Sequence, residues 1–298
     1  MKGRVGVAGL GIMGGAISRN LAAAGWEVHG FDPDPEQAAR AAARGVAIAA
    51  DSASLAAEVP VVLASLPSAS AAIATAEAVA GAAVLRTLVE LSTLAVADKM
   101  RVKEIVERAG GRAIDCPISG TGAQAENRDL VLYASGDSGV IAEVRPLLED
   151  FSRAAHDVGA YGNGSRMKFV ANLLVAIHNV ASAEAMVLAM KAGLDLKQVV
   201  ALVAAGAGTS RVFELRAPMM AEARYTPATM KNAIWQKDMA VIAAFAAEIG
   251  CPVPLFSASA PYYAATMAMG HAEDDTAAVC AVLEVMAGSP RRAGSNKS

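Results

Sequence analysis

A glycine-rich turn near the start of the chain constrains the fold more than any other feature. The apolar run 4–8 is typical of a buried strand, Gly9, Gly11 and Gly14 follow it, and a helical pattern begins at about residue 16. The first glycine permits a tight turn, the second lets the backbone approach a pyrophosphate, and the third lets helix and strand pack closely. The turn therefore predicts a dinucleotide site, and the alternative is an ordinary strand-to-helix turn that binds no nucleotide.

The residues after the turn indicate which dinucleotide is bound. The run 27–31 is typical of a second strand, and Asp32 follows it directly. An acidic residue about 20 positions after the glycines is placed to bind a ribose 2′-hydroxyl. A carboxylate there repels a 2′-phosphate, and the adjoining Pro33-Asp34 supplies no arginine to neutralise one. We therefore expect NAD rather than NADP.

Strand-like and helical patterns alternate through the first half of the chain. Further strand-like runs occur at 59–65, 86–91 and 112–115, with alanine-rich helical stretches between them. Strands that alternate with helices indicate a parallel, doubly wound sheet. Two more runs, 130–134 and 154–158, are expected to extend the same sheet. Residues 1–162 are therefore predicted to form a Rossmann-type α/β domain.

The pattern changes after Gly159. From Ser165 to about Ala192 the chain contains neither proline nor glycine, and Gly193 is a plausible C-terminal cap. A helix of that length spans roughly 40 Å, enough to join two domains. The remaining residues follow helical patterns. We therefore expect an all-α domain at 163–288, with an interdomain helix at 163–192 and a disordered tail at 289–298.

Composition and charge exclude several classes of protein. The chain has 298 residues, enough for two domains, and its net charge of −3 shows no nucleic-acid-binding signature. Its three cysteines are far apart, which argues against disulfides and zinc, and no two histidines have the spacing of a metal pair. No apolar run is expected to be long and clean enough to span a bilayer. The pattern favours a cytoplasmic protein without a bound metal.

Three clusters outside the glycine turn could carry chemistry. Lys168 and Asn172 are four residues apart on one face of the long helix, where they could hold a small substrate and transfer a proton. On spacing alone, the alternative is a lysine exposed to solvent with no catalytic role. Ser119, Gly120 and Thr121 follow a predicted strand, where open α/β folds bind ligands, or they belong to an ordinary polar loop. The adjacent residues Lys237 and Asp238 are the third candidate cluster, and the alternative is an ion pair on the surface of a helix.

In order and spacing, these clusters resemble motifs of the β-hydroxyacid dehydrogenase family, which includes 3-hydroxyisobutyrate dehydrogenases and tartronate semialdehyde reductases. The resemblance runs to about residue 287. The matching segments are Gly9–Gly14 with Met13, Leu66-Pro67, Asp115–Thr121, the set Gly162, Gly164, Lys168 and Asn172, and Lys237-Asp238.

The resemblance implies a Rossmann domain, a long interdomain helix and an all-helical domain used in dimerisation. It implies reversible hydride transfer between NAD and a short 3-hydroxy acid or semialdehyde, in a homodimer or homotetramer. Lys168 would be the general acid and base, and Asn172 would position it and the substrate. The implied cofactor-binding residues are Gly9, Gly11, Ile12, Met13, Gly14, Asp32, Leu66, Pro67, Thr93 and Lys237. The implied substrate-binding residues are Ser119, Gly120, Thr121, Lys237 and Asp238.

Three positions depart from the family pattern. Thr121 replaces the usual second glycine of the substrate loop, Glu90 replaces an aspartate, and the stretch 127–129 lacks a usual glycine. The first departure puts the identity of the substrate in doubt. Imine reduction is an alternative activity, but the retained Lys168 and carboxylate loop argue against it. A catalytically silent NAD-binding scaffold is the other alternative, and loss of Lys168 or Asn172 would have signalled it.

Overall fold

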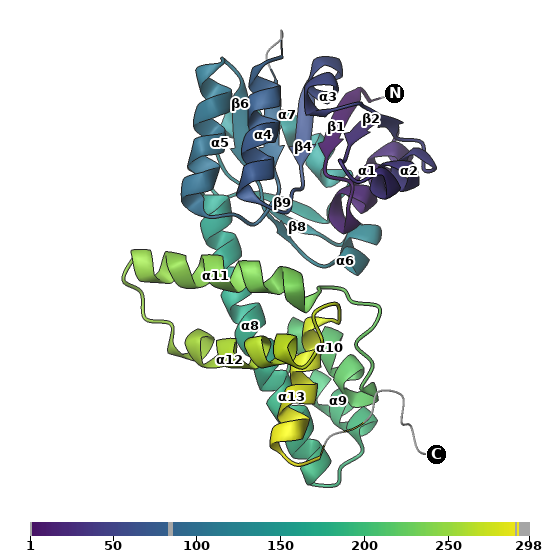
Figure 1. Cartoon of the computed structure of the whole chain (residues 1–298), viewed down its shortest axis with the longest axis vertical. Coiled ribbons are helices and arrows are strands. Elements are labelled where there is room, and N and C mark those ends of the chain that lie inside the picture. The colour runs from purple at the N-terminus through teal and green to yellow at the C-terminus, as the bar shows by residue number, and fades with distance from the viewer. Residues whose placement is uncertain (1, 83–85, 290, 292–298) are drawn as a thin grey trace. The chain divides into compact units, whose positions relative to one another are not determined.

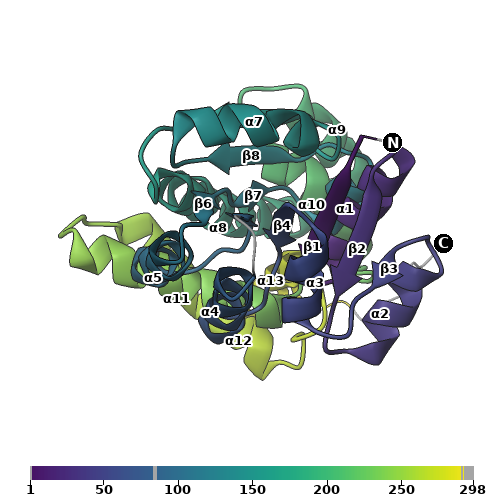
Figure 2. The ribbon, with the colours of Figure 1, turned by 90° about the horizontal axis from the view of Figure 1, so that it is seen from above.

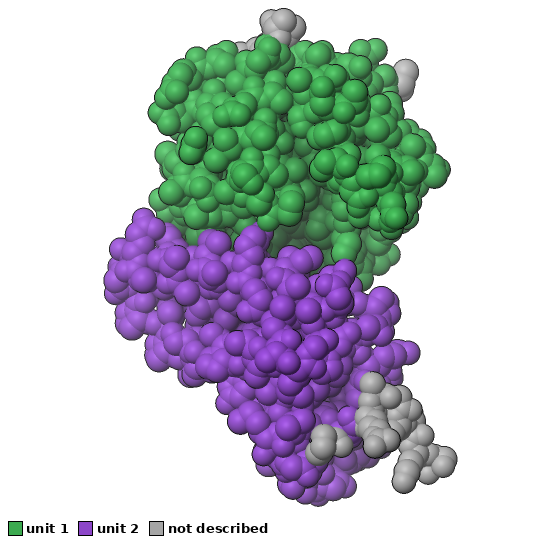
Figure 3. All heavy atoms as spheres, in the orientation of Figure 1, with its two compact units in different colours: residues 1–169 green, residues 170–298 purple. Residues whose placement is uncertain are grey.

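The structure is a computed structural model that describes residues 2–82, 86–289 and 291 (Figure 1). The chain divides into two compact units, residues 1–169 and 170–298 (Figure 3). The boundary falls within helix α8 (Asn163–Lys191), a few residues beyond the position expected at 162. The longest helix therefore belongs to both units.

The main sheet of the first unit has six parallel strands in the order β3-β2-β1-β4-β5-β6. This is the doubly wound order of a Rossmann-like domain, so the predicted fold class is confirmed. The short strand β3 was not predicted, and both of its residues are exposed. The strands are β1 (Arg4–Ala8), β2 (Glu27–Phe31), β3 (Ala47–Ile48), β4 (Val61–Ala64), β5 (Thr87–Glu90) and β6 (Arg112–Asp115).

Helices cover both faces of this sheet (Figure 2). Alternate strand residues enter two separate apolar cores: Leu63 and Val89 join one, while Val62 and Leu88 join the other. Burial on both faces explains why the strands are apolar runs and not polar-apolar alternations. The first core receives α1 (Ile12–Ala23), α2 (Pro35–Ala42) and α7 (Ser138–Glu149), and the second receives α3 (Ser52–Glu58), α4 (Ala69–Ala80) and α5 (Val96–Arg108).

The expectation that 130–134 and 154–158 extend the main sheet is wrong. These runs contain β8 (Val131–Ala134) and β9 (Ala154–Asp157), which form a separate three-stranded sheet with β7 (Ile118–Ser119). The backbone of Asp115 pairs with Ser135 in an antiparallel bridge, and Pro117 follows without an N–H to continue a ladder. The chain therefore leaves the main sheet after β6 and pairs antiparallel with β8.

The elements of the second unit's described residues are helices, as predicted, apart from one isolated bridge between Lys231 and Asp275. Helix α8 ends near the expected position, and Gly193 adopts the left-handed conformation with φ of +73°. Of the expected tail, Ser289 and Arg291 are described, and the Arg291 backbone N–H donates to Glu284 at 3.1 Å. The remaining elements are α9 (Leu196–Ala204), α10 (Arg211–Glu222), α11 (Asn232–Glu248), α12 (Pro254–Ala268), η1 (Thr276–Ala278) and α13 (Val279–Met286).

Helix α8 contradicts one expectation from composition. By length and apolar content it could cross a membrane, whereas no such run was expected. Of its most apolar window, 44% is buried inside the protein. A core helix of a water-soluble protein meets the same criterion, so this finding is weak evidence for a membrane.

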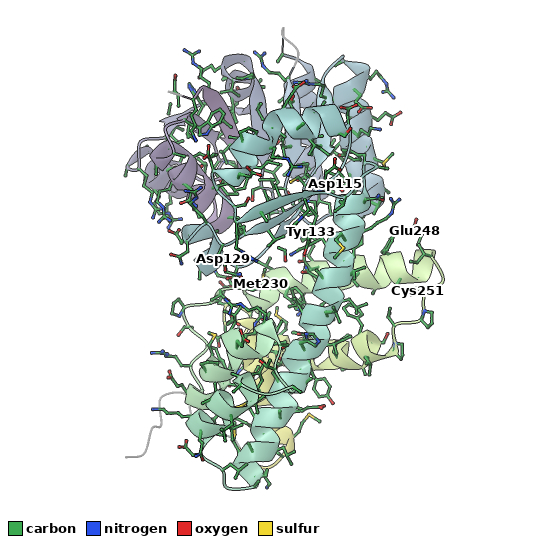
Figure 4. All side chains as sticks on the ribbon, turned by 180° about the vertical axis from the view of Figure 1, so that it is seen from behind. Asp115, Asp129, Tyr133, Met230, Glu248 and Cys251 are labelled. Atoms are coloured by element: carbon green, nitrogen blue, oxygen red, sulfur yellow. The ribbon has the colours of Figure 1, made fainter. Side chains whose placement is uncertain are left out.

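The start of α8 lies against the main-chain atoms of the two sheets. A Cβ atom added at Gly164 would lie 2.3 Å from the Tyr133 carbonyl oxygen and 2.8 Å from that of Asp115. Figure 4 shows both labelled residues beside this end of the helix. Glycine at this helical position is therefore a packing requirement.

We predict that Gly164→Ala destabilises the protein, although alanine normally stabilises a helix by up to about 1 kcal/mol relative to glycine. The cause is the clash with backbone atoms, which cannot move aside as a flexible side chain can. The measurement is the free energy of unfolding by denaturant. Gly81→Ala is the matched control, because a Cβ there would make contacts of only 3.5 Å and longer. Equal stability of the two variants would contradict the close approach.

Candidate functional site

The three glycines of the first turn occupy three different environments. A Cβ at Gly9 would lie 2.2 Å from the Ser65 carbonyl oxygen, and one at Gly14 would lie 1.8 Å from that of Gly9. A Cβ at Gly11 would meet nothing within 4 Å. No side chain caps the helix that begins at Ile12, and its first turn has no acidic residue. Gly11 therefore has open space beside it and lies next to backbone N–H groups that no side chain caps. A bound pyrophosphate requires both features.

Asp32 lies beside this turn, as the spacing predicted. Its carboxylate accepts hydrogen bonds from the backbone N–H of Leu10 at 2.7 Å and of Asp34 at 2.9 Å. The Gly9 N–H donates to the Phe31 carbonyl at 2.8 Å, which joins the two loops a second time. The carboxylate is thereby fixed in orientation and retains acceptor capacity for a ligand hydroxyl.

The loops after β4 and β5 adjoin the glycine turn at the carboxyl edge of the sheet. The Ser65 N–H donates to the Ala8 carbonyl at 2.8 Å, and the Leu66 N–H donates to Ser92 Oγ at 2.8 Å. Pro67 and Thr93 each follow one of these bonded residues in the chain. The predicted cofactor-binding positions of the first unit therefore belong to neighbouring loops.

The predicted substrate loop, Ser119–Thr121, leads into the short helix α6 (Gly122–Glu126). Thr121 is the N-cap of that helix, and its backbone N–H donates to Gln124 Oε1 at 3.0 Å in a capping box. Thr121 Oγ1 also donates to Gln124 Oε1 at 3.4 Å, a bond that the glycine of the family pattern could not make. At the other departure from the pattern, Arg128 adopts a left-handed backbone with φ of +58°, the conformation that glycine adopts most readily.

Helix α6 is attached to α1, the helix that follows the glycine turn. Asn20 Nδ2 donates to the Ala125 carbonyl and Arg19 Nη2 to the Glu126 carbonyl, both at 2.7 Å. A Cβ at Gly122 would lie 2.5 Å from Ile12 Cγ2. Helix α6, which follows the predicted substrate loop, therefore contacts α1, which follows the glycine turn, within one unit.

Lys168 lies on α8, whose first turn is held by two residues of the sheets. The Gly164 N–H donates to Ser135 Oγ at 2.9 Å, and the Ser165 N–H donates to Asp115 Oδ2 at 2.8 Å. Ser165 Oγ also donates to Asp115 Oδ1 at 2.9 Å. Lys168 follows Ser165 by three residues, so it lies one turn further along the helix.

A buried lysine holds the carboxylate that receives these bonds. Lys99 on α5 forms ion pairs with Asp115, at 2.9 Å, and with Glu90, and all three residues are at least 99% buried. Burial alone lowers the pKa of Lys99, but the charges of Asp115 and Glu90 outweigh it and raise that pKa above its ordinary value. Sequence reasoning missed Lys99 and Ser135. One signal was present for Lys99, since it shares a helix face with the apolar Val102 and Val106.

Cys116 follows Asp115 in the chain but has no sign of reactivity. It is fully buried, and burial raises the pKa of its thiol far above the ordinary value. A thiol that remains protonated is a poor nucleophile. Cys116 is therefore a packing residue.

The second unit carries the remaining predicted positions. Asn172 Nδ2 donates to Asp238 Oδ2 at 2.9 Å, and both residues are buried. Lys237 Nζ lies 3.6 Å from Asp238 Oδ1 and its side chain is 34% exposed. Asp238 thus orients the amide of Asn172 and is paired with Lys237. Among the described residues, no group of three or more histidines, cysteines and acidic residues could hold a metal ion.

Protein-family models match both halves of the chain. Residues 4–162 match the NAD binding domain of 6-phosphogluconate dehydrogenase. Residues 162–283 match the family described as the NAD-binding domain of NADP-dependent 3-hydroxyisobutyrate dehydrogenase. The chain therefore contains an NAD(P)-binding domain of a known dehydrogenase type, followed by the helical domain that accompanies it.

Relatives match over nearly the whole chain. A probable 3-hydroxyisobutyrate dehydrogenase of Mycobacterium tuberculosis is 32% identical over 94% of this chain and 97% of its own length. An L-threonate dehydrogenase of Cupriavidus necator is 29% identical over 94% and 95%. Glyoxylate/succinic semialdehyde reductase 1 of Arabidopsis thaliana is 27% identical over 92% and 96%.

A solved structure agrees with these matches. The 3-hydroxyisobutyrate dehydrogenase of Mycobacterium tuberculosis, solved with L-serine, has a TM-score of 0.85 and 31% identity over 95% of this chain and 99% of its own. Its agreement in fold extends through the sheet domain and the helical domain. On the family models and these relatives together, the chain is an enzyme of the β-hydroxyacid dehydrogenase family.

Proposed function

We propose that this enzyme transfers a hydride between NAD(H) and a short 3-hydroxy acid or its semialdehyde. One observation carries the proposal most strongly. Within the first unit, the glycine turn, Asp32, the Ser119–Thr121 loop and the start of the helix that bears Lys168 are joined by contacts at one edge of the sheet. Ligands of open α/β sheets bind at the carboxyl edge of the strands.

The residues present fit a dinucleotide. The open space at Gly11 and the uncapped start of α1 suit the pyrophosphate, and Asp32 suits the adenosine ribose. When bound, the dinucleotide donates or accepts the hydride. The proposed contacts are Gly9, Gly11, Ile12, Met13, Gly14, Asp32, Leu66, Pro67 and Thr93 in the first unit, and Lys237 in the second.

We assign proton transfer to Lys168. In reduction, its ammonium donates a proton to the carbonyl oxygen while the carbonyl carbon receives the hydride. In oxidation, the neutral amine accepts the hydroxyl proton. Asn172 positions the substrate oxygen through an amide that Asp238 orients by its 2.9 Å hydrogen bond. Lys237 supplies a positive charge from α11.

The substrate is proposed to carry a carboxylate. Ser119 and Thr121 offer hydroxyl donors and Gly120 offers a backbone N–H, and hydrogen bonds to an anion are stronger than those to a neutral group. The described chemistry of the relatives agrees, because threonate, 3-hydroxyisobutyrate, glyoxylate and succinic semialdehyde are all carboxylates. The side chain of Thr121 adds bulk, which favours unbranched acids over 3-hydroxyisobutyrate.

We further propose a cytoplasmic homodimer or homotetramer that binds neither nucleic acid nor membrane. Its net charge of −3 and its three free cysteines support a reducing compartment without nucleic-acid partners. Several large apolar side chains of the second unit are exposed, among them Leu188 at 72% and Leu255 at 67%. Packing of another subunit against this unit would bury these side chains.

The cofactor preference is predicted to be NAD over NADP, because the fixed carboxylate of Asp32 repels a 2′-phosphate. Asp32→Ser combined with Pro33→Arg is expected to move the preference towards NADP. The measurement is kcat/KM with NADH and with NADPH. Asp34→Asn is the control: it removes a neighbouring charge yet can still cap α2, and it should leave the preference unchanged. Comparable kcat/KM values for both cofactors in the natural protein would contradict the prediction.

Lys168→Ala is expected to lower kcat by about 10²–10⁴, the usual contribution of a positioned proton-transfer group. NADH affinity, measured by fluorescence titration, should be retained because the glycine turn is untouched. Lys168→Arg should fail as well, since a guanidinium is not deprotonated in proteins. Arg166→Ala changes an exposed cation on the same helix and should leave kcat near its natural value. Near-normal turnover by Lys168→Ala would refute the assignment.

Carboxylate recognition is predicted to favour succinic or tartronic semialdehyde over propionaldehyde by up to about 10⁴ in kcat/KM. An uncharged aldehyde leaves the donors of the loop unpaired, and discrimination of this kind reaches about that size. The measurement is NADH oxidation with a panel of semialdehydes, uncharged aldehydes and cyclic imines. Equal kcat/KM for charged and uncharged aldehydes would show that the loop does not bind a carboxylate. Preference for the imines would favour the imine reductase alternative.

A further inference from the structure

We propose that Asp115 and Ser135 are positioning residues for Lys168, and that the ion pair between Lys99 and Asp115 holds them in place. They cap α8 from the sheets, so the sheets determine where Lys168 lies. The inference rests on the proposed role of Lys168 in proton transfer.

The residue before helix α8 has no side chain with which to cap it. The first N–H groups of a helix lack partners within the helix, and a side chain at the N-cap position normally satisfies one of them. Gly162 precedes the first helical residue, and its φ of +92° strains any residue with a side chain. The bonds from Gly164 to Ser135 and from Ser165 to Asp115 replace that cap with side chains distant in the sequence.

The Asp115 carboxylate is held on every side. One oxygen accepts from the Ser165 N–H at 2.8 Å and from Ser135 Oγ at 3.2 Å. The other accepts from Ser165 Oγ at 2.9 Å and lies 2.9 Å from Lys99 Nζ. A buried carboxylate with four partners cannot turn without leaving polar groups unpaired, which is costly in the interior. Asp115 is therefore a fixed point to which α8 is attached.

Lys99 extends the same network to a second strand. Its ammonium also pairs with Glu90 at the end of β5, and Glu90 Oε1 accepts from the Ser92 N–H at 3.1 Å. Ser92 in turn accepts from Leu66. Hydrogen bonds and ion pairs thus connect the loops after β4 and β5 to the start of α8. Glu90, a departure from the family pattern, is part of this connection.

The connection matters because Lys168 is close to the attached turn. Ser165 and Lys168 are three residues apart, so they are neighbours on one helix face, with a rise of about 4.5 Å between them. A shift of Ser165 therefore moves Lys168 by a similar amount. A misplacement of about 1 Å in a catalytic group can cost about 10²-fold in rate.

The test measures kcat, KM, NADH affinity and melting temperature for Asp115→Asn, Ser165→Ala and Ser135→Ala, each alone and combined with Lys168→Ala. We expect kcat to fall about tenfold for the two serine variants and about 10²-fold for Asp115→Asn. NADH affinity should stay within about twofold. In the Lys168→Ala background the same substitutions should lower the residual kcat no further, because there is no longer a lysine to misplace.

Asp137→Ala is the matched control for lost stability. Asp137 caps α7 in the same unit through a 2.9 Å bond from the Val140 N–H, and among the described residues its side chain forms no hydrogen bond or ion pair with Lys99, Asp115 or Ser165. This variant should lower the melting temperature and leave kcat unchanged. If Asp115→Asn does not fold, Ser165→Ala decides the question, because it retains the carboxylate and its ion pair with Lys99.

Two results would overturn the inference. Unchanged kcat in Ser165→Ala and Ser135→Ala would show that the cap does not position Lys168. If the network variants lowered kcat by the same factor in the natural protein and in the Lys168→Ala background, the network would act on the whole protein and not through Lys168. Near-normal kcat in Lys168→Ala alone would instead refute the proposed role of Lys168 in proton transfer, and that result is seen before any network variant is considered.

Discussion

The attachment of helix α8 to the Asp115 carboxylate is the interaction on which the candidate site of the first unit depends. A helix that begins after a left-handed glycine has no good cap of its own, so its first N–H groups need partners from elsewhere. Asp115 and Ser135 supply them, and the absence of a side chain at Gly164 permits the close approach. The direction of α8 at its start is therefore determined by the ends of β6 and β8.

The same edge of the sheet assembles the other functional loops by similar means. Backbone N–H groups donate to side chains of neighbouring loops, as Leu10 does to Asp32 and Leu66 does to Ser92. Thr121 is the N-cap residue of α6, and α6 is bonded to α1, the helix that follows the glycine turn. Each loop is thus hydrogen-bonded to another, so the loops at this edge of the sheet form one connected network and are not independent turns.

Local sequence patterns predicted the features that depend on local physics. The glycine turn, Asp32, the alternation of strands and helices, and the end of α8 near Gly193 each require only a few neighbouring residues. The separate sheet of β7, β8 and β9 was missed because its runs look the same as strands of the main sheet. Its existence depends on where the chain leaves β6, and Pro117 was the available signal.

Ion pairs between residues distant in the sequence could not be predicted from local sequence patterns. Lys99 is a charged residue with an ordinary helical setting, and its partners Glu90 and Asp115 are placed beside it by the sheet. Apolar residue type is also a poor guide to which positions of α8 are buried. Val170 and Leu174 are 54% and 46% exposed, whereas the buried positions include Asn172 and Asn179. A stripe of apolar residues does not show which side of a long helix is covered.

Hydrogen exchange at the start of α8 tests the central claim most directly. First-turn amides of a helix usually lack protein partners and exchange rapidly, as expected for Ile12 and Met13 at the uncapped start of α1. If Asp115 and Ser135 hold α8, the amides of Gly164 and Ser165 should be protected to the same degree as those of the buried strand β6. Exchange of these two amides at the rate of Ile12 and Met13 would contradict the account.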